Sequence, residues 1–426
     1  APIKVLDAKK VILTLADNTT NTITDSSRLS TEEDYSAAIY SKEDLIINGN
    51  GTLNVNAGYR NGIKSTDDCI IVSGTLNITS TEDGIIGKDL CGVVAGDINI
   101  NAGSDGIKST YDTDTTKGNV IIEGGNITIK ASNDGIQAEN ILVINDGAIN
   151  IKTNNGAADT TQTHIDNMDM GRGGFGFNNN KTTTTTDDTS ESRKGIKAGN
   201  MLIINDGDIT IDSDDDSVHC NSVIYIYGGT INAATGDDGV HADDLLTVNG
   251  GTINITQCYE GIEADDIVIN DGDISVVSSD DGINSSDGSI TINGGNLLIN
   301  ASGDGLDANG SIIINGGYIV VLGPTSDGDT AIDYDDSCTI NGGTVMAFGS
   351  SGMLEIPKGA SNGACIVTAF TSVSGGSKYT LSDSNGNEIL SYTPSKAYAA
   401  AIVYSDKITT GNTYDITAGS TTLSIE

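Results

Sequence analysis

Short runs of alternating apolar and polar residues fill most of the chain, and they recur with a period of about 22 residues. One unit contains a segment such as DGIKS, a second apolar run, and a third run that follows an Asn-x-Gly turn, as in INDGDITI. Alternation with a period of two is typical of a β-strand with one buried face. Each unit therefore predicts three short strands separated by turns.

The repeat can be followed through the second residue of the DGIKS-like segment. This residue stands at positions 38, 62, 84, 106, 135, 195, 217, 239, 261, 282, 305 and 331. Three such short strands cannot pair within one unit, but each can pair with its equivalent in the next unit, about 4.8 Å away. Parallel crossovers are strongly biased to the right hand. The pattern predicts an all-β fold, a right-handed parallel β-helix of about twelve coils.

Three regions are distinguished by this pattern. Residues 1–349 form the predicted β-helix, and a low-complexity insertion at about 154–193 lengthens one of its turns. After residue 349 the repeat stops, and alternating segments with an Asn-Gly turn continue to residue 426. We expect residues 350–426 to form a small C-terminal β cap that packs on the helix end and covers its open sheet edge.

The second turn of the unit carries a recurring asparagine followed by glycine. Stacked asparagines hydrogen-bond along the axis of stacked sheets, and glycine supplies the positive φ that tight corners need. We therefore expect a structural asparagine ladder along this turn, made by Asn48, Asn145, Asn205, Asn249, Asn270, Asn293, Asn315 and Asn341.

The chain is strongly acidic, with a net charge of −38 from 59 acidic and 21 basic residues. Such a charge argues against binding to nucleic acid or to an anionic membrane surface. No apolar run approaches the roughly 20 residues of a membrane-spanning helix, so membrane insertion is not expected. The lysine-poor composition, rich in Thr, Asn and Gly, favours an extracellular or cell-surface protein, and we expect a monomer.

Acidic residues gather at the first turn, most densely after residue 212. Stacking places them in columns about 5 Å apart, where ionised carboxylates repel one another unless cations lie between them. Clustered carboxylate oxygens suit Ca²⁺. The candidate calcium ligands are Asp215, Asp216, Asp237, Asp238, Glu260, Glu263, Asp280, Asp281, Asp304, Asp307 and Asp333.

An Asp-Gly pair also has an ordinary structural interpretation. The aspartate hydrogen-bonds to its own backbone and the glycine adopts positive φ, which together make a tight turn. Any one Asp-Gly pair is explained in this way. The paired acids Glu260 with Glu263 and Asp304 with Asp307 are the ones that turn chemistry explains least.

At these corners the chain resembles a known family. The segments DDGVHADD, DDGINSSDG and GDGLDANG, together with the C-terminal SDSNGNEILSYTPSKAY, resemble clostridial carbohydrate-binding β-helix proteins that are polysaccharide-lyase-like. The resemblance covers nearly the whole chain. It implies an extracellular protein that carries Ca²⁺ and binds plant cell-wall polysaccharide, namely cellulose and/or acidic sugars such as polygalacturonate.

The candidate sugar-contacting residues are of two kinds. With no tryptophan and only 4 phenylalanines in the chain, an aromatic surface for cellulose has to come from tyrosines such as Tyr225, Tyr227 and Tyr259. The column two residues after the turn glycine carries Lys197, His219 and His241, which complete the set.

Two other functions remain open. The DGLD corner at Asp304 and Asp307 is similar to the calcium corner of one pectate lyase family, which implies a calcium-dependent lyase acting by β-elimination. Such an enzyme needs a basic side chain to abstract the proton α to the carboxylate. The candidate base is Lys197, which lies two coils below the Asp238 corner and several coils away from Asp304. Because this base is far from the Asp304 corner, we expect binding without catalysis. A spacer in a surface-layer protein is the third interpretation.

Overall fold

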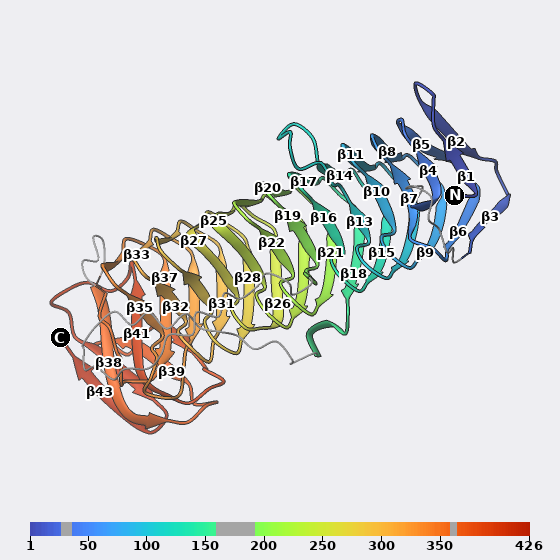
Figure 1. The fold of residues 1–426 in the computed structure, drawn as a ribbon. Coiled ribbons are helices and arrows are strands. Elements are labelled where there is room, and N and C mark those ends of the chain that lie inside the picture. The colour runs from blue at the N-terminus through green and yellow to red at the C-terminus, as the bar shows by residue number, and fades with distance from the viewer. Residues whose placement is uncertain (27–35, 159–191, 358–363) are drawn as a thin grey trace, which may run out of the picture.

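The computed structural model of the chain describes residues 1–26, 36–158, 192–357 and 364–426. Figure 1 shows an elongated stack of parallel coils, with the N-terminus at one end and the C-terminal strands at the other. The stack is a β-solenoid of about 12 turns, and within the described residues it contains no α-helix. The predicted parallel β-helix is confirmed.

Each coil contributes three strands, which pair with their equivalents in the coils before and after. The first-strand series comprises β1 (Ile3–Val5), β4 (Ala37–Ser41), β7 (Asn61–Ser65), β10 (Ile85–Gly87), β13 (Ile107–Lys108), β16 (Ile136–Ala138), β19 (Ile196–Ala198), β22 (Val218–Cys220), β29 (Ile283–Ser285), β32 (Leu306–Ala308) and β35 (Ile332–Tyr334).

The second-strand series follows in the same sheet. It comprises β2 (Val11–Leu15), β5 (Leu45–Gly49), β8 (Asp68–Ile71), β11 (Leu90–Val93), β14 (Asn119–Ile122), β17 (Ile141–Ile144), β20 (Met201–Ile204), β23 (Val223–Ile226), β30 (Ile290–Ile292), β33 (Ser311–Ile314) and β36 (Ser337–Ile340). Two longer strands, β25 (Val240–Val248) and β27 (Ile262–Ile269), run through both series.

The third-strand series forms a separate sheet. It comprises β3 (Thr20–Asp25), β6 (Thr52–Ala57), β9 (Thr75–Ser80), β12 (Asp97–Ala102), β15 (Asn126–Ala131), β18 (Ala148–Thr153), β21 (Asp208–Ser213), β24 (Thr230–Thr235), β26 (Thr252–Cys258), β28 (Asp273–Ser278), β31 (Asn296–Asn300), β34 (Tyr318–Leu322) and β37 (Thr344–Gly349). A short 3₁₀ turn, η1 (Gly156–Ala158), follows β18.

The core is a set of aliphatic columns that run along the axis. In the first-strand series the inward residues Ile63, Ile85, Ile107, Ile136 and Ile196 are all fully buried. Burying one such side chain contributes about 1.5 to 3 kcal/mol, so the repeated column is a main source of stability. Because each residue packs on its equivalent in the next coil, the fold holds the turns in register as well.

The asparagine ladder is present along the second turn. Side-chain amides donate to the carbonyl oxygen of the preceding asparagine, at 2.7 Å from Asn205 to Asn145 and 2.8 Å from Asn293 to Asn270. Asn145 itself donates to Glu123, and Tyr227 interrupts the ladder between Asn205 and Asn249. The ladder continues through Asn315 and Asn341. The glycine that follows the turn has positive φ, as at Gly207 with φ 114°.

Residues after Gly349 form antiparallel strands. Strand β41 (Tyr398–Ser405) pairs with β37 and with β38 (Ala364–Val373), and so extends the third-strand sheet by two antiparallel strands. A second sheet contains β39 (Tyr379–Asp383), β40 (Glu388–Tyr392), β42 (Tyr414–Ala418) and β43 (Thr421–Ile425). Both pack over the outward side chains of Val320, Leu322, Met346 and Phe348.

Most of the predicted insertion lies outside the described residues. Its beginning, Asn154 to Ala158, and its end, from Ser192, are described. Separately, no helix in the described parts of the chain is long and apolar enough to cross a membrane.

Candidate functional site

In most coils the first turn presents a carboxyl group, and one oxygen of that group accepts a backbone N–H of the next coil. Asp83 Oδ1 accepts the backbone N–H of Asp105 at 3.1 Å, and Asp281 Oδ1 accepts that of Asp304 at 2.6 Å. In an earlier coil, Asn61 Oδ1 accepts the backbone N–H of Asp83 at 3.0 Å. The backbone N–H therefore needs a side-chain oxygen as its acceptor, and that oxygen can be uncharged. Where the residue is an aspartate, its second carboxylate oxygen is left for other partners.

This geometry corrects the turn interpretation for the Asp-Gly pairs of the first turn. The aspartate bonds to the next coil and not to its own turn, and the glycine has no positive φ. At Gly282 an added Cβ would lie 2.5 Å from the carbonyl oxygen of Gly305 and 2.2 Å from a methyl carbon of Ile299. Glycine is required there because neighbouring coils approach too closely for a side chain.

In the middle of the column the protein supplies its own positive charge. Lys194 Nζ lies 2.6 Å from Asp216 Oδ2 and 2.8 Å from Asp215 Oδ1, and His219 Nδ1 lies 2.8 Å from the same Asp216 oxygen. Burial alone would raise the pKa of Asp216, but Lys194 and His219 hold it well below its usual range. Two of the predicted calcium ligands, Asp215 and Asp216, are thus paired with a lysine.

The same coil anchors the base of the insertion. Arg193 Nη1 and Asn154 Nδ2 lie 2.8 and 2.9 Å from Asp214 Oδ2, and Lys152 pairs with Asp212. The sequence interpretation missed this role, although the acidic run SDDD lies one coil after the insertion. The acids Asp212 and Asp214 of this coil thus pair with the basic residues Lys152 and Arg193 at the two ends of the insertion.

Two imidazoles follow on consecutive coils. The rings of His219 and His241 contact edge to face, with centroids 4.9 Å apart. His241 Nδ1 lies 3.1 Å from Asp238 Oδ2 and 3.2 Å from Glu263 Oε2. Burial raises the pKa of Asp238 well above its ordinary value and that of Glu263 to about 8. The histidines predicted as sugar contacts therefore lie among carboxylates.

Further along, the column contains carboxylates without a basic partner. Asp281, Asp304 and Asp307 each offer an oxygen within 4.8 Å of the others. Burial, and then repulsion among these acids and Asp280, raises the pKa of Asp281 to about 9. Burial likewise raises the pKa of Asp304 to about 7 and of Asp307 to about 6. Among the described residues, no Lys, Arg or His lies within 4.0 Å of these carboxylates. We call these three residues the acid-only corner.

The remaining predicted ligands surround this corner. Asp333 is in register with Asp307 one coil on, and burial raises its pKa. Glu260, whose pKa burial raises to about 8, accepts a hydrogen bond from the Asn284 amide at 2.9 Å. Asp237 joins a second acidic group with Asp215 and Asp216. A further group, Asp44 with Asp67 and Asp68, was not predicted because its acids stand outside the DGIKS-like segment.

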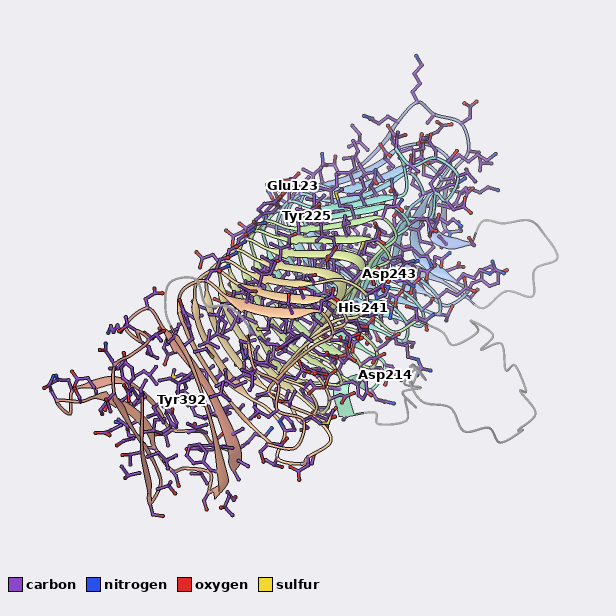
Figure 2. All side chains as sticks on the ribbon, turned by 90° about the vertical axis from the view of Figure 1, so that its left-hand side faces the viewer. Glu123, Asp214, Tyr225, His241, Asp243 and Tyr392 are labelled. Carbon is purple, nitrogen blue, oxygen red and sulfur yellow. The ribbon has the colours of Figure 1, made fainter. Side chains whose placement is uncertain are left out.

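The predicted tyrosines divide between two places. Tyr225 and Tyr227 stack on an outward face, with ring centroids 6.4 Å apart and an interplanar angle of 21°. Tyr259 is half-buried beside Glu260 at the first turn. Figure 2 shows Tyr225 and Glu123 on one long edge of the molecule and Asp214 toward the opposite edge. The tyrosine pair is therefore separate from the acidic column.

Lys197 lies in the mixed column of the first-strand series. Its Nζ is 3.2 Å from Ser192 Oγ. Five steps of strand register, through His219, His241, Glu263 and Asn284, separate it from Asp307. At about 4.8 Å per step the two residues are roughly 24 Å apart.

Comparison with known protein families gives a clear match. A family model described as carbohydrate-binding domain-containing protein matches residues 1–239 and 237–348. The chain belongs to this carbohydrate-binding domain family. Both the acidic column and the stacked tyrosines lie within the matched residues.

One relative with the same description comes from Acetivibrio thermocellus. It is 39% identical over 82 residues, which are 18% of this chain and 29% of the relative. The chain thus matches less than a third of that relative's length. No solved structure matches the chain.

Proposed function

We propose that this member of the carbohydrate-binding domain family is an extracellular, calcium-binding protein of plant cell-wall polysaccharide. Ca²⁺ at the acid-only corner binds acidic sugars such as polygalacturonate. The family assignment supports carbohydrate as the partner. The clustering of carboxylates at the acid-only corner is the observation that supports calcium as the ion and an acidic sugar as the ligand.

The ligand set fits Ca²⁺ in type and number. Asp281, Asp304 and Asp307 offer carboxylate oxygens within 4.8 Å of one another, and Asp333 lies in register beside them. Ca²⁺ accepts six to eight oxygen ligands with flexible geometry, and it takes them from carboxylates, carbonyls, water or a sugar. Asp281 and Asp304 each use one oxygen to accept a backbone N–H of the next coil. Their other oxygens and both oxygens of Asp307 are therefore the ones that bind the ion.

Charge determines how an acidic polymer approaches. A protein with a net charge of −38 repels a polyuronate over most of its surface. A cation shared between protein and sugar carboxylates reverses that repulsion at one place. Binding of polygalacturonate is therefore expected to depend fully on the bound cation.

The other candidate ligands are assigned secondary roles. Glu263, Asp238 and His241 form a mixed group that adjoins the acid-only corner and extends the acidic column toward the insertion. His219, His241 and Lys197 present polar groups along this column to a bound acidic chain. A lyase resembling the pectate lyases remains the second candidate. Lys197, however, lies roughly 24 Å from Asp307, too far to act on a sugar bound there.

Affinity electrophoresis in gels that contain polygalacturonate tests the proposal. The protein should be retarded in Ca²⁺ and should migrate freely with excess chelator. Asp281→Asn, which keeps the oxygen that accepts the backbone N–H of Asp304, should strongly reduce the retardation. Asp83→Asn is the matched control, because Asp83 has the same backbone bond but lies outside the carboxylate groups.

Retardation that persists in chelator would refute the proposed role of calcium. Incubation with polygalacturonate and Ca²⁺, followed by ultraviolet absorbance, tests for unsaturated ends. We expect no increase in absorbance, and an increase would establish the lyase instead.

A further inference from the structure

At His241 the first turn brings one imidazole against two carboxylates. His241 Nδ1 lies 3.1 Å from Asp238 Oδ2 and 3.2 Å from Glu263 Oε2. Asp238 precedes His241 in the same turn, and Glu263 stands in strand register with it one coil on. The repeat therefore brings the three donor atoms together, all within 4.8 Å of one another. We call these three residues the histidine corner.

The second ring nitrogen of each histidine in this column faces an oxygen. His219 Nε2 lies 2.8 Å from Asn221 Oδ1, and His241 Nε2 lies 3.6 Å from Asp243 Oδ1, which is labelled beside it in Figure 2. An oxygen at this position favours the tautomer that carries its proton on Nε2, so Nδ1 presents a lone pair. Histidines that bind metals are oriented in the same way by a carboxylate or a carbonyl oxygen.

The preceding coil balances its charges in a different way. His219 Nδ1 lies 2.8 Å from Asp216 Oδ2, and Lys194 Nζ lies 2.6 Å from the same oxygen. Among the described residues, no lysine or arginine lies within 4.0 Å of Asp238 or Glu263. A proton on the imidazole of the histidine corner balances only one of its two carboxylates. A divalent cation between the three donor atoms balances both.

The donor atoms are held in place by the stacked coils. Asp238 Oδ1 accepts the backbone N–H of Glu260 at 3.2 Å, which leaves Oδ2 directed at the imidazole. The ring of His241 contacts that of His219 edge to face. The side chain of His241 is 25% exposed, while that of Asp238 is 9% exposed. The histidine corner is therefore preformed at its base and open to solvent on the side of the imidazole, where an ion can enter.

The distances and the donor types select the class of ion. Zn²⁺ binds imidazole nitrogen and carboxylate oxygen at about 2.0 to 2.2 Å, so the ligand atoms of a tetrahedral site are about 3.4 Å apart. Both nitrogen–oxygen distances at the histidine corner are close to this value. Imidazole suits zinc and its neighbours among the transition metals, whereas Ca²⁺ takes oxygen ligands.

We propose that the histidine corner is a site for a divalent transition metal such as Zn²⁺, bound by His241 Nδ1, Asp238 Oδ2 and Glu263 Oε2. Water fills the fourth position, as in zinc sites with three protein ligands. His219 remains paired with Asp216 and does not bind the metal. The site differs from the acid-only corner in its donors and in its ion, and it depends neither on calcium nor on the proposed carbohydrate ligand.

Calorimetric titration of Zn²⁺ into the metal-free full chain, in buffer that contains excess Ca²⁺, tests this site. One Zn²⁺ should bind tightly, and His241→Asn should weaken that binding about a hundredfold or more, because it removes the nitrogen donor. His219→Asn is the matched control, since His219 has the same place in the preceding coil, and it should change the affinity less than about threefold. Co²⁺ in place of Zn²⁺ should give the visible absorption of a tetrahedral site, which His241→Asn should lose.

Glu263→Gln separates metal binding from stability. Glutamine keeps the shape of the side chain but removes its charge, so the thermal midpoint of the metal-free variant should stay close to that of the wild type while Zn²⁺ affinity falls about tenfold or more. Absence of Zn²⁺ binding by the wild type, equal affinity in His241→Asn, or displacement of Zn²⁺ by the excess Ca²⁺ would overturn the proposal. Asp281→Asn should keep the Zn²⁺ site, and His241→Asn should keep the Ca²⁺-dependent retardation by polygalacturonate, so either proposal can fail without the other.

Discussion

Asp216 and Asp281 occupy the same position in the repeat, yet their surroundings are opposite. Asp216 faces Lys194 and His219, and its pKa lies well below the usual range. Asp281 faces only other acids, and burial with that repulsion raises its pKa to about 9. Both aspartates use one oxygen to accept the backbone N–H of the next coil. The difference teaches that the fold tolerates a stack of carboxylates, while the local supply of positive charge decides what each one does.

The largest expected effect is the loss of Lys194. Lys194→Met leaves Asp216 buried without its main partner, and breaking such a pair costs about 3 to 5 kcal/mol. The midpoint of urea unfolding should fall strongly, with or without Ca²⁺. Adding Asp216→Asn should recover much of the loss, because asparagine keeps the backbone acceptor. A small change in the single variant would contradict the pairing.

Asparagine at the two positions should act with opposite sign. Asp281→Asn should raise the unfolding midpoint in chelator, since it removes repulsion, and should weaken Ca²⁺ binding about tenfold or more in calorimetry. Asp216→Asn should lower the midpoint in both conditions and leave Ca²⁺ affinity unchanged. If the two variants behaved alike, the contrast between the regions would be lost.

The pH dependence of stability should report the acid-only corner. The pKa values of Asp281, Asp304 and Asp307 are raised to about 9, 7 and 6. A raised carboxyl pKa contributes stability that is complete below the unfolded pKa near 4 and is lost as pH rises through the folded value. In chelator the thermal midpoint should decline from about pH 4 to pH 9, and Ca²⁺ should reduce that decline. A thermal midpoint that rises over this pH range in chelator would contradict the raised pKa values.

A smaller effect is expected at Lys108, which pairs with Asp105 at 2.6 Å on an earlier coil. This pair is less buried on the lysine side than Lys194 is, so Lys108→Met should cost only about 1 kcal/mol. Urea unfolding of both lysine variants under one condition gives the comparison. A cost equal to that of Lys194→Met would show that burial does not distinguish the two pairs.

The sequence predicted the repeat, the strand series and the asparagine ladder, because each follows from a period that the chain repeats many times. It also predicted that Asp281, Asp304 and Asp307 meet. It did not predict that Lys194 pairs with Asp216, since the pairing joins side chains of different coils and depends on their length. Nor did it predict the backbone role of the aspartates, which appears only when coils are stacked.

The open outward face of the second-strand series was missed for another reason. A strand such as the one at Val223–Ile226 carries apolar residues on both faces, and such a run is typical of a strand that is buried on both sides. Only the burial of each residue shows that one of these faces is open. Tyr225 and Tyr227 were predicted to form an aromatic surface, but the aliphatic residues beside them on this face were not.

Anomalous diffraction from crystals grown with Ca²⁺ tests the central claim most directly. The account predicts a peak bonded to carboxylate oxygens of Asp281, Asp304 and Asp307, at about 2.3 to 2.6 Å, and no peak between Lys194 and Asp216. A map without density at the acid-only corner, or with its cation beside Lys194, would contradict the account.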